Sequence, residues 1–166
     1  MAEAVVARAR ELVVERFPDA KAAYLAGSIA AGRATASSDL DIVVVQGSDD
    51  AETFREALRR GGRLVELFAH TAATYREFWD ADVASRRCTM PQMYAGGIIL
   101  VSRNGFAQAR QAEAARLVEA GPPALGPEAL ETMRYLLTDA LDDLADLTDP
   151  IEVAACAAGV LEMAAD

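Results

Sequence analysis

Two aspartates two residues apart, Asp39 and Asp41, have the clearest chemical potential in this sequence. The apolar run Ile42–Val45 follows them, and its β-branched residues are typical of a buried strand. Side chains at positions i and i+2 of a strand lie on one face, about 6–7 Å apart. Two such carboxylates repel each other unless a hard cation, Mg²⁺ or Mn²⁺, lies between them. The alternative is a pair of solvated aspartates on an edge strand, which the apolar run disfavours.

A third carboxylate, Glu66, lies inside the next apolar run, residues 63–70, with Val65 and Leu67 on either side. A charge among apolar neighbours needs a partner, because burying it alone is costly. A metal cluster shared with Asp39 and Asp41 would supply that partner. The alternative is a glutamate that faces water from a strand edge.

The pair Gly27-Ser28 follows a short apolar run, residues 22–26, and indicates a strand-to-helix turn. At such a turn, free backbone N–H groups and a hydroxyl can hold a phosphate. Gly-Ser pairs are common in turns, so this pair indicates a phosphate-binding turn only in combination with the two aspartates.

Together these motifs resemble the nucleotidyltransferases of the DNA polymerase β superfamily in their short bacterial form. The family has Gly-Gly or Gly-Ser after an apolar strand, then Asp-x-Asp on a second strand and a third acid on a neighbouring strand. Here the matching segments are Leu25-Ala26-Gly27-Ser28, Ser38-Asp39-Leu40-Asp41-Ile42-Val43-Val44 and Val65-Glu66-Leu67. The resemblance covers residues 22–105, and the helical remainder resembles, less specifically, the C-terminal bundle of antibiotic nucleotidyltransferases.

The resemblance implies a role for each motif residue. Asp39 and Asp41 would hold two Mg²⁺ ions, with Mn²⁺ as a substitute, and Glu66 would be the third ligand of the ion that activates the acceptor. Gly27 N–H and Ser28 would bind the β- and γ-phosphates of an NTP co-substrate. Ser38 joins this nucleotide-binding group, chiefly as a turn residue beside the first metal ligand.

The patterns predict an α+β fold in two parts. Residues 1–105 would form a mixed-sheet nucleotidyltransferase domain with flanking helices, and residues 106–166 an acidic helical region resembling a small bundle. Strands are predicted at residues 22–26, 39–45, 63–70 and 97–102. Helices are predicted at residues 4–17, from Asp49 to the Gly61-Gly62 pair, after Thr71, and at residues 107–120, 127–147 and 150–166.

Other residues have weaker claims to function. His70 lies four residues after Glu66, ~13 Å along the strand, which is too far to share its metal; we expect a structural or rim histidine. Tyr75, Phe78 and Trp79 share one helical face and either form core or stack on a nucleobase, and core is the commoner outcome. Arg33 could reach a phosphate from its turn.

Composition excludes several classes of protein. With 52% hydrophobic residues the chain can form a core, and a net charge of −10 argues against nonspecific nucleic-acid binding. We expect a cytoplasmic protein, because no apolar run approaches a membrane span of about 18 residues and Met1–Ala4 lacks a basic signal segment. Cys88 and Cys156 are isolated and indicate neither a zinc site nor a disulfide.

The C-terminal part carries most of the negative charge, with 3 basic and 12 acidic residues from position 106 onward. The cluster Asp139, Asp142, Asp143 and Asp146 favours a polycationic acceptor such as an aminoglycoside, or is simply a solvated face. The last helix ends at Asp166 without a cap. We therefore expect either a partner for its apolar face, including a homodimer through these helices, or a continuation of the chain.

Three functions follow from these features. The leading hypothesis is transfer of a nucleoside monophosphate from NTP to a hydroxyl of a small-molecule acceptor, with release of pyrophosphate. The second is a minimal nucleotidyltransferase of a toxin–antitoxin module, which modifies a partner protein by AMPylation. The third, a catalytically silent nucleotide-binding protein, is disfavoured by the complete set of motif residues.

Overall fold

The computed structural model describes residues 2–165, which form five strands and seven helices. The strands are β1 (Ala22–Leu25), β2 (Leu40–Val45), β3 (Phe54–Arg60), β4 (Arg63–His70) and β5 (Ile98–Ser102). The helices are α1 (Ala2–Arg16), α2 (Gly27–Ala30), α3 (Tyr75–Ala84), α4 (Thr89–Ala95), α5 (Phe106–Ala120), α6 (Pro127–Asp146) and α7 (Pro150–Ala165). The chain end at Asp166, for which we expected a partner or a continuation, lies outside the described residues.

The five strands form one mixed sheet in the order β3-β4-β2-β1-β5. The central pair, β2 and β4, is parallel, while β1 pairs antiparallel with both β2 and β5, and β3 pairs antiparallel with β4. Helices flank this sheet, and two more helices follow it in the sequence, so the predicted α+β class is confirmed.

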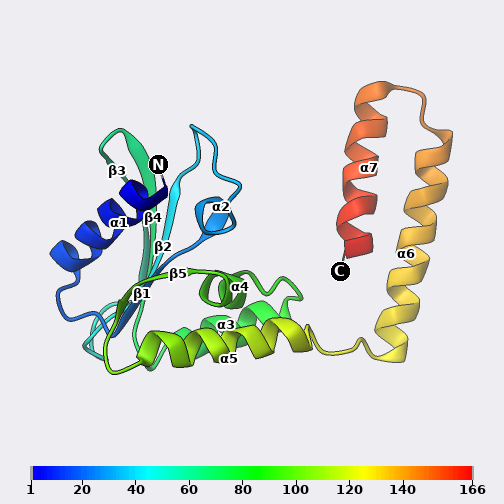
Figure 1. Ribbon diagram of the computed structural model, residues 1–166. Helices are drawn as coiled ribbons and strands as arrows, with labels where there is room; N and C mark the ends of the chain where they lie inside the picture. Colours follow the sequence, from blue (N-terminus) through cyan, green and yellow to red (C-terminus); the bar gives the residue numbers. More distant parts are fainter. Residues whose placement is uncertain (1, 166) are drawn as a thin grey trace. The chain divides into compact units, whose positions relative to one another are not determined.

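Helices cover both faces of the sheet (Figure 1). On one face, Ala9, Leu12 and Val13 of α1 pack in a cluster with Ile42 and Val44 of β2. The other face packs against α3, α4 and α5, and its cluster contains Val43 and Val45 together with Tyr24, Tyr75, Trp79 and Tyr94. Successive residues of β2 thus alternate between the two cores, as the pleat requires. Asp41 therefore projects on the same face as Val43 and Val45.

The helix that we predicted from Asp49 to the Gly61-Gly62 pair is wrong, because this segment contains β3, an edge strand. Asp49 forms an ion pair with Lys21 at 2.9 Å and does not begin a helix. Gly61 and Gly62 have φ angles of +58° and +79° and join β3 to β4 in a tight hairpin. Pairing with β4 overrides the local helical signals.

The first compact unit extends past the boundary that we expected. The contacts divide the chain into Met1–Pro122 and Pro123–Asp166, whereas we placed the division after Gly105. Helix α5 belongs to the first unit because its buried Ala107 and Ala114 join the core beneath the sheet. In addition, the Tyr24 hydroxyl donates to the carbonyl oxygen of Ala107 at 2.9 Å.

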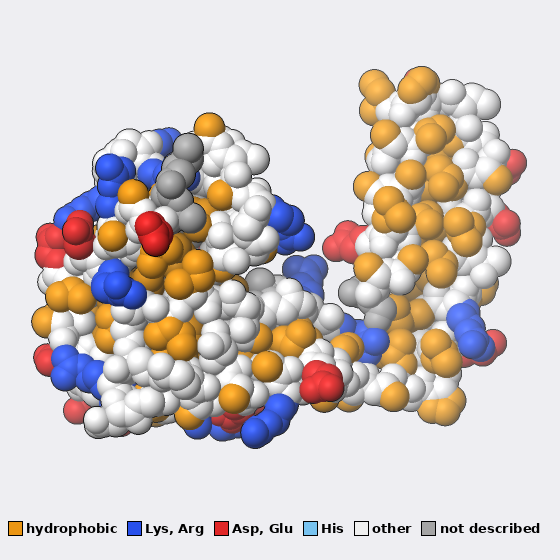
Figure 2. Space-filling model, viewed as in Figure 1, with side chains coloured by type: hydrophobic (Ala, Val, Ile, Leu, Met, Phe, Trp, Pro, Cys, Tyr) orange, Lys and Arg blue, Asp and Glu red, His pale blue; other side chains and the backbone are white. Residues whose placement is uncertain are grey.

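The second unit is a hairpin of α6 and α7. The N-terminus of α7 is capped, since Asp149 Oδ1 accepts hydrogen bonds from the backbone N–H groups of Ile151 and Glu152. None of the described residues of either helix is buried. Hydrophobic side chains run along the hairpin in Figure 2, and the large exposed ones are Leu130, Tyr135, Leu136, Leu141, Ile151 and Leu161. No helix within residues 2–165 has the length and hydrophobicity of a membrane span.

Candidate functional site

Two of the predicted site residues, Asp41 and Glu66, lie beside each other on the parallel strands β2 and β4. Asp41 and Glu66 are register partners in this strand pair, so their side chains lie on the same face of the sheet. Asp39, half-buried, directly precedes β2 and is two residues from Asp41. The sheet register thus brings the carboxylates of Asp41 and Glu66 side by side.

Gly27 closes over this carboxylate pair. The backbone N–H of Ala26 donates to the carbonyl oxygen of Asp41 at 2.8 Å, which holds the turn after β1 against β2. Gly27 follows with a φ of +67°, and a Cβ atom there would lie 1.9 Å from Oδ2 of Asp41. No other residue fits this position without moving the aspartate.

The carboxylates influence one another electrostatically. Burial raises the pKa of Asp41, the negative charges of Asp39 and Glu66 raise it further, and the nearby Arg55 guanidinium opposes them. Three like charges on a half-buried surface disfavour ionisation, and a cation at the same point would reverse that effect.

Arg55, on edge strand β3, is a site residue that sequence reasoning missed. Its Nη2 donates to Glu66 Oε2 at 2.7 Å, and its guanidinium carbon lies 4.8 Å from the ring centroid of Phe68. The missed signal is the Gly61-Gly62 pair between residues 54–60 and residues 63–70, because a glycine pair between two strands is typical of a hairpin. A hairpin places β3 beside β4 and hence Arg55 near Glu66.

The donor set fits a divalent cation of the Mg²⁺ type. Asp39, Asp41 and Glu66 offer only hard carboxylate oxygens, and Asp41 and Glu66 line one pocket. Across residues 2–165, however, no three His, Cys, Asp or Glu side chains are gathered closely enough to surround an ion by themselves. A three-carboxylate site would therefore require the Glu66 side chain to turn from Arg55 toward the aspartates.

A pocket of about 710 Å³ opens from the carboxylates toward α3 and α4. Asp41 and Glu66 line it together with His70 and Phe78. His70 is only 4% exposed, and within residues 2–165 neither of its ring nitrogens has a hydrogen-bond partner. Burial lowers the pKa of His70 to about 4, so the imidazole is neutral at pH 7.

The three aromatic residues of α3 have different environments. Tyr75 and Trp79 are buried in the core on this side of the sheet. Phe78 is 41% exposed, lines the pocket and lies 4.5 Å from the His70 ring, centroid to centroid. Phe78 is therefore the member of this group that a ligand can reach.

A second pocket of about 380 Å³ adjoins the first and shares Gly27, Thr89 and Met93 with it. Ser28 and Arg33 line this second pocket. Both offer hydrogen-bond donors next to the Gly27 turn.

Ser38 has different surroundings from Gly27 and Ser28. Its hydroxyl accepts a hydrogen bond from the Thr35 N–H at 2.9 Å, and its carbonyl oxygen accepts one from Arg63 Nη1 at 2.7 Å. It lines another pocket, beside Arg63. In this structure Ser38 shapes the loop before Asp39.

Comparisons with known proteins agree with this arrangement. Residues 6–78 match the family model described as "Nucleotidyltransferase domain". Among solved structures, the chain is similar to a nucleotidyltransferase-like protein from Exiguobacterium sibiricum 255-15, with a TM-score of 0.50 and 10% sequence identity. The similarity covers 96% of this chain and 55% of that protein, so this chain spans about half of its length. No curated protein matches at a significant level.

Residues 6–78 thus match a nucleotidyltransferase domain, which supports a nucleotidyltransferase of the polymerase β type. The matched segment, residues 6–78, includes Gly27, Asp39, Asp41 and Glu66. The predicted resemblance and the predicted enzyme class, a nucleotidyltransferase, are confirmed for this domain.

Proposed function

We propose that the protein transfers a nucleoside monophosphate from an NTP to a hydroxyl of a small-molecule acceptor and releases pyrophosphate. The observation that carries this proposal is that Gly27, Asp41 and Glu66 line one pocket, in which only glycine fits against the Asp41 carboxylate. The neighbouring pockets supply room for two substrates.

In this proposal Asp39, Asp41 and Glu66 hold the divalent cations. When bound, such ions stabilise both the attacking oxygen and the departing pyrophosphate in an in-line displacement. The acceptor oxygen forms a bond to the α-phosphorus as the bond from that phosphorus to the leaving pyrophosphate oxygen breaks. In this proposal Glu66 also takes the proton of the acceptor hydroxyl.

The chain's other residues bind and orient the NTP. The Gly27 N–H and the Ser28 hydroxyl bind the β- and γ-phosphates, and Arg33, which lines the same pocket, adds a positive charge. Phe78 stacks on an uncharged ring such as a nucleobase, because neutral His70 beside it contributes no charge.

For the acceptor we propose a cationic small molecule, on the basis of the acidic residues of α6, Asp139, Asp142, Asp143 and Asp146. Electrostatic attraction of this kind is screened over about 8 Å at physiological ionic strength. Binding of a polycationic acceptor should weaken as salt rises, and weaken again when Asp142, Asp143 and Asp146 are changed to Asn. Equal acceptor affinity of that variant and the parent at low salt would remove the cationic acceptor from the proposal.

A second candidate is modification of a partner protein. It is favoured by the α6–α7 hairpin, in which none of the described residues is buried and large apolar side chains such as Leu136 and Leu161 are exposed. Exposed apolar surface of this kind is typical of protein interfaces.

The test is incubation of the protein with each NTP and Mg²⁺, together with aminoglycosides, lincosamides or candidate partner proteins, followed by mass spectrometry. The proposal predicts an acceptor heavier by one nucleoside monophosphate and an equal amount of pyrophosphate. Modification of a protein alone would favour the second candidate. Release of inorganic phosphate without pyrophosphate would contradict both.

A further inference from the structure

A cluster of arginines lies away from the carboxylates, at the turn between β3 and β4. Arg8 from α1, Arg59 from β3 and Arg63 from β4 line a pocket of about 480 Å³ with Ser37 and Ser38. We call these five residues the arginine pocket. We propose that it binds a phosphate group of a ligand other than the reacting NTP.

The charge of the arginine pocket stands out from that of the chain. The whole sequence has a net charge of −10, yet among the described residues that line this pocket there are three arginines and no acid. Within residues 2–165 the guanidinium groups of Arg8 and Arg59 form no ion pair. Guanidinium groups without an acidic partner that line one pocket favour an anion there.

The wall of the arginine pocket is held in place by hydrogen bonds. Arg63 donates from Nη1 to the carbonyl oxygen of Ser38, which anchors its guanidinium and leaves its other N–H groups for a ligand. The Thr35 hydroxyl lies 3.2 Å from the hydroxyl oxygens of both Ser37 and Ser38. Gly61 also lines this pocket, and the space beside it is open, since a Cβ atom there would meet no other atom within 4 Å.

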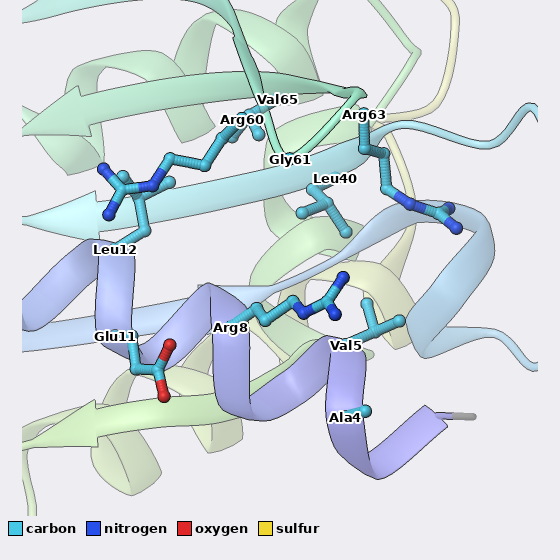
Figure 3. A pocket seen from close by; sticks show the side chains of 10 residues that line it. All are labelled: Ala4, Val5, Arg8, Glu11, Leu12, Leu40, Arg60, Gly61, Arg63 and Val65. Atoms are coloured by element: carbon cyan, nitrogen blue, oxygen red, sulfur yellow. The ribbon is translucent and has the colours of Figure 1, made fainter.

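Two acidic residues of α1, Glu11 and Glu15, act on Arg60, another arginine of this hairpin. Figure 3 shows the adjoining pocket, in which Arg8 and Arg63 extend toward one end while Arg60 extends away from them. Arg60 is paired with Glu15, and Glu11 also acts on it electrostatically. These acids therefore compensate Arg60 and leave the arginine pocket positive.

A phosphate suits this geometry better than a carboxylate or a neutral group. Arginine forks form paired hydrogen bonds with phosphate oxygens, and three of them match the charge of a pyrophosphate or of two neighbouring phosphates. The arginine pocket has no residue in common with the two pockets beside Gly27. It is therefore separate from the proposed NTP site, although Ser38 directly precedes Asp39.

The test is calorimetric titration of the full chain with inorganic pyrophosphate without Mg²⁺, which keeps the proposed metal-dependent site out of the measurement. Arg8→Gln and Arg59→Gln should each weaken binding about tenfold, because each removes a charge-assisted hydrogen-bond donor. Arg116→Gln on α5 is the matched control, since it removes the same charge from an exposed position. Arg63 is left intact because it also holds the loop.

Unchanged pyrophosphate affinity of the double variant Arg8→Gln/Arg59→Gln, with thermal unfolding like that of the parent, would overturn the proposal. So would an equal loss in Arg116→Gln, because the effect would then be general charge. Titration with ribose 5-phosphate and with a short single-stranded oligonucleotide identifies the source of the phosphate. Tighter binding of the oligonucleotide that weakens steeply with salt indicates a nucleic acid, and preference for the sugar phosphate indicates a small molecule.

Discussion

Replacement of Gly27 by alanine separates the chemistry of the site from the stability of its turn. The new Cβ would lie 1.9 Å from Asp41 Oδ2, whereas real contacts of this kind are essentially never shorter than 3.0 Å. The carboxylate must therefore move by about 1 Å, and a displacement of that size at a reacting centre costs roughly a hundredfold in rate. The positive φ of +67° adds about 1–2 kcal/mol of backbone strain.

Gly32→Ala is the matched control for this variant. Gly32 has nearly the same φ, +69°, but a Cβ there would meet nothing within 4 Å. Both variants should lose about 1–2 kcal/mol of stability through backbone strain, measured as the free energy of unfolding, and Gly27→Ala should lose more because of its contact with Asp41. Only Gly27→Ala should lose nucleotidyl transfer, measured as the initial rate of pyrophosphate release. Similar rates in the two variants would refute the close approach of Gly27 to a catalytic carboxylate.

Three further outcomes follow from individual contacts. Arg55→Gln should change stability by less than about 1 kcal/mol, because its ion pair with Glu66 is exposed. The variant should need less Mg²⁺ for half-maximal activity, because Glu66 is then free to bind the cation. A higher Mg²⁺ requirement would contradict the competition between Arg55 and Mg²⁺ for Glu66. In the parent, the free energy of unfolding should fall by about 3 kcal/mol as pH falls from 6.5 to 4, because His70 binds a proton more tightly in the unfolded state than in the buried site. His70→Leu should lack this loss, and an unchanged pH dependence in the variant would contradict the buried neutral imidazole. Asp149→Ala should reduce the helicity of α7, measured by circular dichroism, because it removes a cap of about 1 kcal/mol, while an unchanged spectrum would show that the cap is dispensable.

Strand periodicity lets the sequence predict the face of β2 on which Asp41 lies, and the apolar residues after it indicate a central strand. Asp39 directly precedes β2, and its place beside Asp41 stays a prediction. The proximity of Glu66 follows only once β2 and β4 are known to be parallel neighbours in this register. The family resemblance supplied that pairing, since strand order is not written in local periodicity.

Local sequence patterns do not predict strand β3. Asp49 and Glu52 have the spacing of a capping box, but pairing along β4 outweighs that weak signal. As a consequence Arg55 was missed, because on a helix it would have had no fixed relation to Glu66. His70 fits the expectation of a structural or rim histidine, since it is 4% exposed and lines the pocket. Its packing against Phe78 could not be predicted from distance along the strand.

Nucleotidyl transfer by Asp41→Asn tests the central claim most directly. Transfer should fall to background in a folded protein, because Asn lacks the charge needed to hold the cations. The thermal midpoint should stay or rise, since burial and the negative charges of Asp39 and Glu66 already raise the pKa of Asp41 and oppose its ionised form. Asp50→Asn, at an exposed position, is the control and should transfer at the parental rate. Parental transfer by folded Asp41→Asn would contradict the account.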